Sequence, residues 1–202
     1  MRLFVFARHA ESVLNHENRV NGDPARPAPL TERGRDEARL LGLQLRSLPL
    51  DACLHTRFGR TLETARYAVE GRDVPLLQEE LFDDVRIGDL EGWTVERYRA
   101  WKREHNRSDR FPGGESLDET AHRYAAAYRR LLERPLQCAL VVCHEIPIRY
   151  ALNAAADSDE LDGPVHAIPN ATPFLFDDEA LERAAQRVER LASRASGTRS
   201  QR

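Results

Sequence analysis

The chain has 202 residues, a length that fits one domain with a sizeable core. Hydrophobic residues make up 41% and charged residues 31%, as expected of a globular and not a disordered chain. The formal net charge of −3 gives no bulk attraction to nucleic acid or to an anionic membrane, so we expect neither as a partner.

The three cysteines predict a reducing environment. Cys53, Cys138 and Cys143 are odd in number, lack CxxC spacing and lie in apolar stretches, so we expect buried thiols without a disulfide. The apolar run at residues 3–7 is too short for a signal-peptide core, and no apolar run approaches the roughly 18 residues of a membrane span. We therefore expect a cytoplasmic protein.

The first half of the chain alternates strand and helix patterns. Residues 3–7 are apolar at every position, which is typical of a strand covered on both faces. A proline-rich loop at 21–30 follows, and Thr31 is the predicted N-cap of a helix that stops before Pro49. We expect a second strand at 50–55, a second helix at 59–69 and a short edge strand at 75–77.

The second half begins with an acidic segment, 79–92, that has no clean period, and with a short helix between Val95 and Trp101. The turn at 112–116 leads into a helix with a capping box and a stop at Pro135. An apolar strand at 139–143, a helix at 146–154, a short strand at 173–176 and a helix at 179–192 complete the pattern. We expect one domain over residues 1–192 and a frayed or disordered tail at 193–202.

This alternation predicts an α/β fold, with a mostly parallel central sheet flanked by helices on both faces in a single three-layer domain. Ligands in such folds bind at the carboxyl ends of the strands. Arg8 and His9 follow the first strand, and His144 follows the late apolar strand. We therefore expect these three side chains to meet at one edge of the sheet.

Four sparse motifs occur in order along the chain. They are Arg8-His-Ala-Glu-Ser12, the segments 56–65 and 112–116, and Val141-Val-Cys-His-Glu145. An Arg-His pair alone is most often a pair of surface residues, but the ordered set is far more specific. From about residue 3 to about residue 170 the sequence resembles the histidine phosphatase superfamily, which includes the cofactor-dependent phosphoglycerate mutases.

The resemblance implies a phosphoglycerate mutase-like fold and a phosphoryl-transfer enzyme in which His9 is the nucleophile. A neutral imidazole nitrogen can attack phosphorus and hold the group as a phosphohistidine. The resemblance places the second family arginine at Arg60 and not at Arg57. Arg8, Arg60 and a protonated His144 would then balance the charge on the phosphoryl oxygens.

Four further residues are predicted to surround the substrate, namely Ser12, Asn15, Gly22 and Glu145, and the resemblance places a late family asparagine at Asn170. The proton donor in the family is usually a glutamate four residues before a G-x-x-E-G element. Gly88-Asp-Leu-Glu-Gly92 selects Asp84, one methylene shorter, with Asp83 and Glu80 as alternatives.

Three residues depart from the family pattern. Ala10 replaces a glycine, Glu63 replaces the common glutamine and Glu145 stands where glycine is frequent. The Glu145 charge would either raise the pKa of His144 or select against strongly anionic substrates.

Other constellations carry less weight. The remaining histidines show no HxH or HExxH spacing, so we expect no metal and no cofactor. The aromatic residues Trp93, Tyr98 and Trp101 indicate packing more than substrate stacking. The basic residues around them, Arg97, Lys102, Arg103 and Arg107, form either a solvated face or a patch that attracts phosphate.

The predicted function is metal-independent hydrolysis of the phosphomonoester of a small metabolite. Glycolytic mutases carry a longer insertion between the positions of Gly92 and Pro112, where this chain has only about 20 residues. A cofactor-dependent phosphoglycerate mutase is the alternative, and a non-catalytic protein that binds phosphorylated ligands is another. The substrate and the oligomeric state stay open.

Overall fold

The computed structural model describes residues 2–197. Within them, one sheet is built from β1 (Leu3–Arg8), β2 (Ala52–His55), β3 (Leu76–Gln78), β4 (Cys138–Cys143) and β5 (Pro173–Phe176). The strand order is β3-β2-β4-β1-β5, and every pairing is parallel except the antiparallel pairing of β5 with β1.

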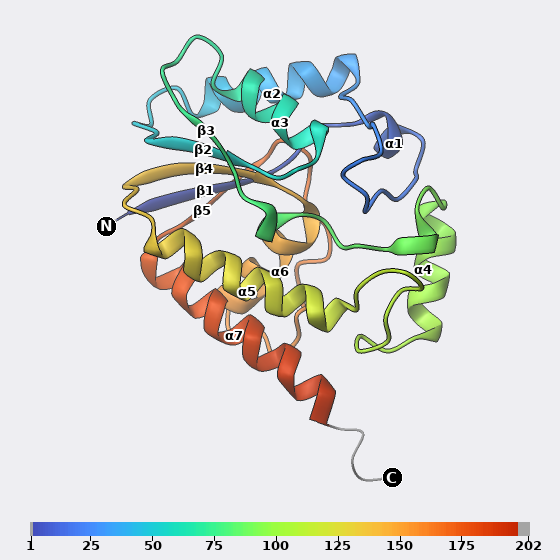
Figure 1. Cartoon of the computed structure of the whole chain (residues 1–202). Coiled ribbons are helices and arrows are strands. Elements are labelled where there is room, and N and C mark those ends of the chain that lie inside the picture. The colour runs from blue at the N-terminus through green and yellow to red at the C-terminus, as the bar shows by residue number, and fades with distance from the viewer. Residues whose placement is uncertain (1, 198–202) are drawn as a thin grey trace.

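Helices cover both faces of this sheet (Figure 1). On one face lie α2 (Glu32–Gln44) and α3 (Gly59–Ala68), and on the other lie α5 (Leu117–Glu133), α6 (Glu145–Ala155) and α7 (Asp178–Gly197). The short α1 (Val13–His16) and α4 (Val95–Glu104) lie beyond the carboxyl ends of the strands. The predicted α/β fold with a mostly parallel sheet is therefore confirmed.

The pairing of β1 with β4 brings two distant segments into register. Arg8 lies opposite Cys143, and the amide of His9 donates to the carbonyl of Cys143 at 2.9 Å. The residues that follow the two strands, His9 and His144, consequently leave the same edge of the sheet side by side.

Successive side chains of β1 point to opposite faces of the sheet, so the strand contributes to the hydrophobic core on each face. Phe4 and Phe6 pack with α5, α6 and α7, whereas Val5 and Ala7 pack toward α2 and α3. Each of these four side chains is completely buried. A strand that is apolar at every position is thus needed because both of its faces are covered.

The predicted elements are found with small shifts. The side chain of Thr31 accepts from the amide of Gly34, and Ser116 forms the expected capping box with Glu119. The acidic segment contains two short 3-10 turns, η1 (Glu80–Phe82) and η2 (Gly88–Leu90). Helix α7 continues to Gly197, so residues 193–197 of the expected tail are helical, and 198–202 lie outside the described residues.

Between residues 2 and 197, no helix is long and apolar enough to cross a membrane. The three cysteines are buried and carry no disulfide.

Phe6 is expected to be a principal stabilising residue, because its ring makes edge contacts with Phe82, Tyr128 and Phe176 from three different elements. Phe6→Ala should lower the free energy of unfolding by about 3–5 kcal/mol, measured by denaturant titration. As the control, Leu175→Ala on β5, where the side chain is 61% exposed, should change it by less than about 0.5 kcal/mol. Equal effects of the two substitutions would contradict the assignment.

Candidate active site

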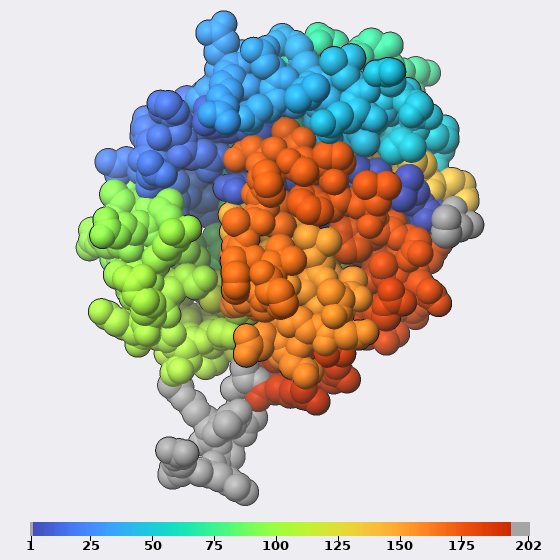
Figure 2. Space-filling view, turned by 180° about the vertical axis from the view of Figure 1, so that it is seen from behind, coloured from blue at the N-terminus to red at the C-terminus, as the bar shows by residue number. Residues whose placement is uncertain are grey.

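A cavity of about 290 Å³ opens at the carboxyl ends of β1 and β4. Figure 2 shows the surface hollowed where the blue N-terminal segment, the green segment of α4 and the orange segment before β5 meet. Nearly all of the predicted site residues line this cavity: Arg8, His9, Ser12, Asn15, Gly22, Arg60, Asp84 and Glu145. His144 lies directly behind them and is 1% exposed.

His9 has one nitrogen committed to the backbone and one directed into the site. Its Nδ1 lies 2.8 Å from the carbonyl of Ala10 and therefore carries the proton, which leaves a lone pair on Nε2. Nε2 accepts from Nε of Arg60 at 2.9 Å. Burial, and secondarily the charges of Arg60 and Arg8, lower the pKa of His9 well below its ordinary value. The imidazole is consequently held neutral, as a nucleophile must be.

The segment that carries His9 is fixed by further hydrogen bonds. Nδ2 of Asn170 donates to the carbonyl of His9 at 2.7 Å, and the amide of Ala10 donates to Thr64 Oγ1 at 3.0 Å. Among the described residues, φ is positive for non-glycine residues at three positions, and Ala10 is not one of them. Alanine in place of the family glycine at position 10 therefore requires no left-handed backbone conformation.

Arg60 is the central cation of the site. From α3, where its side chain is 4% exposed, it donates from Nη2 to Asp84 Oδ2 at 3.1 Å and to the carbonyl of Asn21 at 3.2 Å, besides its bond to His9. Arg57 instead pairs with Asp83 at 2.5 Å, outside the cavity. The structure thus brings Arg60, and not Arg57, to His9.

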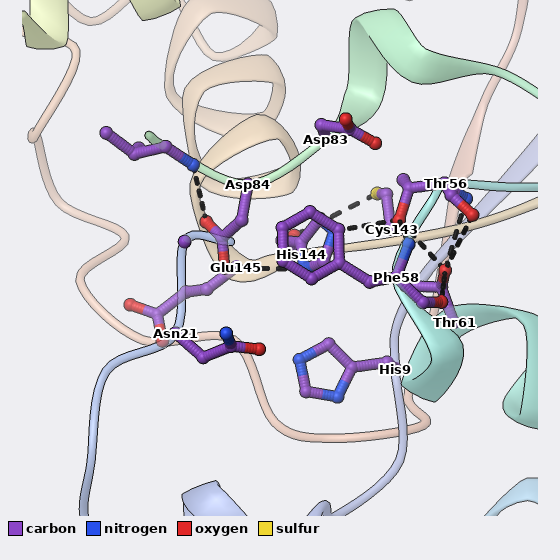
Figure 3. Close-up of polar contacts among 12 residues, drawn as sticks. His9, Asn21, Thr56, Phe58, Thr61, Asp83, Asp84, Cys143, His144 and Glu145 are labelled. Carbon is purple, nitrogen blue, oxygen red and sulfur yellow. Dashed lines mark hydrogen bonds and ion pairs between the residues drawn. The ribbon is translucent and has the colours of Figure 1, made fainter. Parts of the chain in front are cut away.

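The three candidate acids lie in different environments. Asp84 lines the cavity with its side chain 25% exposed, and its Oδ2 lies 3.3 Å from Nδ1 of His144. Asp83 points to another side of the same segment (Figure 3), and Glu80 is exposed and does not line the cavity. Among the three, only Asp84 contacts Arg60 and His144.

Burial is the largest influence on the Asp84 carboxyl and raises its pKa, opposed by the charge of Arg60 and the amide of Val85. A carboxyl group that keeps its proton longer than usual is suited to donate one. Asp84 therefore has both the place and the acidity expected of a general acid.

The environment of His144 in the free site disfavours the protonated state that the sequence analysis expects opposite a phosphoryl group. Burial, followed by the charges of Arg60 and His9, lowers the pKa of His144 well below its ordinary value. Its Nε2 shares a hydrogen bond of 3.0 Å with Thr56 Oγ1. Glu145 is not among the main influences, so the first of the two effects expected of that residue is not found.

Glu145 instead holds two arginines at the rim. Its carboxylate lies 3.0 Å from Nη1 of Arg8 and 3.2 Å from Nη1 of Arg149. Arg8 also donates to the carbonyl of Ile168 at 2.8 Å, while its Nε is buried without a partner among the described residues. Part of the positive charge available to a phosphate group is therefore already neutralised.

Ser12 and Gly22 are engaged within the protein although they line the cavity. Ser12 Oγ donates to Oδ1 of Asn15 at 3.1 Å, and the amide of Gly22 donates to Glu91 Oε2 at 2.7 Å. A Cβ atom at position 22 would lie 2.1 Å from the carbonyl oxygen of Val85, so the loop approaches too closely for any other residue. Their predicted contribution to substrate binding is thus largely to shape the wall.

Several site residues escaped the sequence analysis. Asn21 accepts from Arg60 through Oδ1, Thr56 contacts His144, and Glu91 holds Asn21 at 2.8 Å. Glu91 belongs to the glycine-flanked element that selects Asp84, so a signal existed for it. Thr56 opens the motif segment 56–65, so a signal existed for it too, whereas Asn21 acts through a contact between distant segments for which the sequence offers none.

The aromatic and basic groups near α4 divide between packing and cavity. Trp101 packs on His105 and Phe111, whereas Tyr98 lines the cavity together with Lys102. Arg107 pairs with Asp118 at 3.2 Å. Over residues 2–197, no group of three His, Cys, Asp or Glu side chains is arranged to hold a metal ion.

Comparison with known proteins identifies the family. A profile of the histidine phosphatase superfamily (branch 1) matches residues 4–176, and the chain belongs to that superfamily. The 2,3-bisphosphoglycerate-dependent phosphoglycerate mutase 2 of Gloeobacter violaceus is 34% identical over 135 residues. That match covers 61% of this chain and 60% of the mutase, which is less than two thirds of its length.

A phosphatase is nearly as similar. Phosphoserine phosphatase 1 of Hydrogenobacter thermophilus is 30% identical over 156 residues, covering 72% of each chain. Among solved structures, Bacillus stearothermophilus YhfR superposes with a TM-score of 0.75 at 27% identity, covering 87% of this chain and 90% of that one. The family therefore contributes both phosphatases and mutases to the set of relatives.

We expect Glu145 to weaken the binding of anions. Glu145→Gln removes the charge that pairs with Arg8 and Arg149, and should tighten the binding of inorganic phosphate about three- to tenfold, measured by titration calorimetry. The matched control is Glu179→Gln, because Glu179 also pairs with an arginine four residues later but lies on α7, away from the cavity. Unchanged or weaker phosphate binding by Glu145→Gln would contradict the expectation.

Proposed function

We propose that this protein is a metal-independent phosphomonoester hydrolase that acts through a phosphohistidine at His9. The observation that carries the proposal is the orientation of His9, whose unprotonated Nε2 faces into the cavity beside Arg60. Asp84, on the other side of Arg60, supplies a carboxyl group for proton transfer.

In the first step, Nε2 of His9 attacks phosphorus, the P–N bond forms and the P–O bond to the alcohol breaks. Asp84 gives its proton to the departing alkoxide. Arg60 and Arg8 stabilise the charge on the phosphoryl oxygens, the largest contribution a protein makes to this reaction. Arg60 exchanges its bond to Nε2 for bonds to these oxygens, which frees the lone pair for attack.

In the second step, a water molecule attacks the phosphohistidine. The Asp84 carboxylate accepts a proton from this water, the P–N bond breaks and inorganic phosphate leaves. The charge of a bound phosphoryl group raises the proton affinity of His144, whose imidazole then donates to it. The residue returns to its neutral state once phosphate has left.

Hydrolysis is favoured over mutase chemistry because the segment from Gly92 to Pro112 forms one short helix, α4, with no long insertion to exclude water. The mutase remains the second candidate, since several similar proteins are named as phosphoglycerate mutases or probable phosphoglycerate mutases. The non-catalytic alternative is disfavoured because one side chain, Arg60, lies within hydrogen-bonding distance of three groups suited to catalysis. These groups are His9, Asp84 and His144.

The substrate we propose is a small phosphorylated metabolite, in keeping with the cavity of about 290 Å³ and its basic lining. The proposed location is the cytoplasm, because the buried free thiols of Cys53, Cys138 and Cys143 suit a reducing compartment.

Loss of the nucleophile should abolish activity. We expect the parent protein to release phosphate from p-nitrophenyl phosphate in the presence of a chelator, and His9→Ala to lower kcat by at least about a thousandfold. Rapid quenching of the parent should trap an acid-labile phosphoenzyme that His9→Ala lacks. The exposed His16 provides the control, since His16→Ala should leave both signals unchanged.

Three results would redirect the assignment. Activity that disappears with the chelator would favour a metal-dependent hydrolase. Isomerisation of 3-phosphoglycerate with a bisphosphate primer, and no net phosphate release, would favour the mutase. Binding of phosphorylated ligands without a phosphoenzyme would favour a non-catalytic protein.

The pH profile should follow the two shifted groups. Since the pKa of His9 is lowered, kcat/KM should persist below pH 6.5, the ordinary histidine value, and fall only as His9 becomes protonated. Since the pKa of Asp84 is raised above 3.8, kcat/KM for an alkyl phosphate should fall as pH rises through that higher value and the acid loses its proton. Asp84→Asn should remove this alkaline decline. Because the parent and the variant are compared on the same alkyl phosphate, the ionisation of the substrate affects both pH profiles equally. An alkaline decline that persists in Asp84→Asn would contradict the assignment of Asp84.

A further inference from the structure

Arg123 lies behind the segment that presents Asp84. From α5, its Nη1 donates to the carbonyls of Leu81 and Asp83, at 2.9 and 2.8 Å, and its Nη2 donates to the carbonyl of Asp84 at 3.2 Å. A single guanidinium group therefore binds three backbone carbonyls of residues 81–84, the segment that ends at Asp84, the proposed proton donor.

The guanidinium is itself fixed by a buried carboxylate. Oε1 of Glu115, whose side chain is 1% exposed, accepts from Nη2 of Arg123 at 2.6 Å and from the amide of Arg86 at 3.0 Å. The hydroxyl of Tyr124 adds a bond of 2.9 Å to the carbonyl of Asp83. The backbone is thus held on both sides of Asp84, before it by Arg123 and after it by Glu115.

Arg123 does not belong to the cavity. It is absent from the lining residues, and its hydrogen bonds run to backbone carbonyls and to Glu115. Its positive charge is therefore balanced by Glu115 and not offered to a phosphate group. Its charge contributes to the lowered pKa of His144, an effect that would act on both substrates alike, whereas its contacts reach the site through the Asp84 segment.

We propose that the Arg123–Glu115 pair is a positioning device for Asp84, which sets the distance between its carboxyl group and the departing oxygen of the substrate. The proposal rests on the proposed hydrolase function and on Asp84 as its proton donor. An aspartate is one methylene shorter than a glutamate, so its reach depends on where the backbone lies. Residues 83–87 have no helix or strand of their own to fix that place.

The test compares two substrates that differ in their need for an acid. The p-nitrophenolate leaving group departs without a proton, whereas an alkoxide needs one. Arg123→Met should lower kcat/KM for an alkyl phosphate about 10- to 100-fold, the effect of a misplacement of about 1 Å, and change kcat/KM for p-nitrophenyl phosphate by less than about threefold. This constant reports only the steps up to departure of the alcohol, before the water attack that both substrates share. The affinity for inorganic phosphate should stay nearly constant, because the phosphate-binding groups are untouched.

Two further variants complete the series. Asp84→Asn should show the same selectivity with a larger loss on the alkyl phosphate. Arg123→Lys keeps the charge but cannot reach three carbonyls and Glu115 together, so it should give an intermediate selective loss. Because the lysine variant retains a cation beside Glu115, it also provides a readout if Arg123→Met fails to fold.

The matched control is Arg129→Met. Arg129 lies on the same helix, and both of its Nη atoms donate to the carboxylate of Glu189 on α7, away from Asp84. Arg129→Met should leave the ratio of kcat/KM for the alkyl phosphate to that for p-nitrophenyl phosphate unchanged, even if it lowers thermal stability. A merely structural role for Arg123 predicts an equal loss on both substrates, and that result would overturn the proposal.

Failure of the positioning role and failure of the function look different. If the parent releases phosphate and His9→Ala does not, the hydrolase stands, and an unselective or absent effect of the Arg123 variants refutes the positioning role alone. If Asp84→Asn lowers kcat/KM for both substrates equally, Asp84 is not the proton donor and the positioning role is refuted with it. If the parent releases no phosphate from either ester, the proposed function itself is refuted.

Discussion

The parallel pairing of β1 with β4 is the interaction on which the candidate site depends. Both strands are buried on both faces, so their register is fixed by two cores at once, and a slip by one residue would turn the core side chains of β1 to the wrong face. The bond from the amide of His9 to the carbonyl of Cys143 extends this register one residue past the strands. The two histidines are therefore placed by the core and not by the loops that follow.

Burial then decides the chemistry of the groups so placed. The same desolvation that keeps His9 neutral also lowers the pKa of His144 and raises that of Asp84, while Arg60 remains the charged group among them. The site without substrate thus contains a concentrated positive charge that Asp84 and Asn21 partly satisfy. A phosphate group that enters it replaces internal partners with stronger, charge-assisted ones. Preference for a phosphoryl group follows from this exchange.

Local patterns made much of this arrangement predictable. The apolar strands, the Thr31 and Ser116 caps and the residues at the strand ends follow from neighbouring side chains, and the motif register was enough to choose Arg60 over Arg57. The burial that lowers the pKa of His144 in the free site was not foreseen, because no motif reports how deeply a side chain lies. Arg123 was missed because it acts across about 40 residues of sequence on a backbone segment that the fold alone brings near.

A separate small core supports the half of the site that surrounds the substrate. Val85, Ile87, Leu90, Phe111 and Leu117 pack together, with Val20 and Tyr98 against them, apart from the two cores that flank the sheet. The amide of Val20 also donates to the carbonyl of Trp93, which joins the loop before Gly22 to the start of α4. Changes in this small core would reshape the cavity wall while β1 and β4 keep the reacting groups in place. The Arg123–Glu115 pair connects the two halves, since it ties the segment of Asp84 to α5, a helix that packs on the sheet.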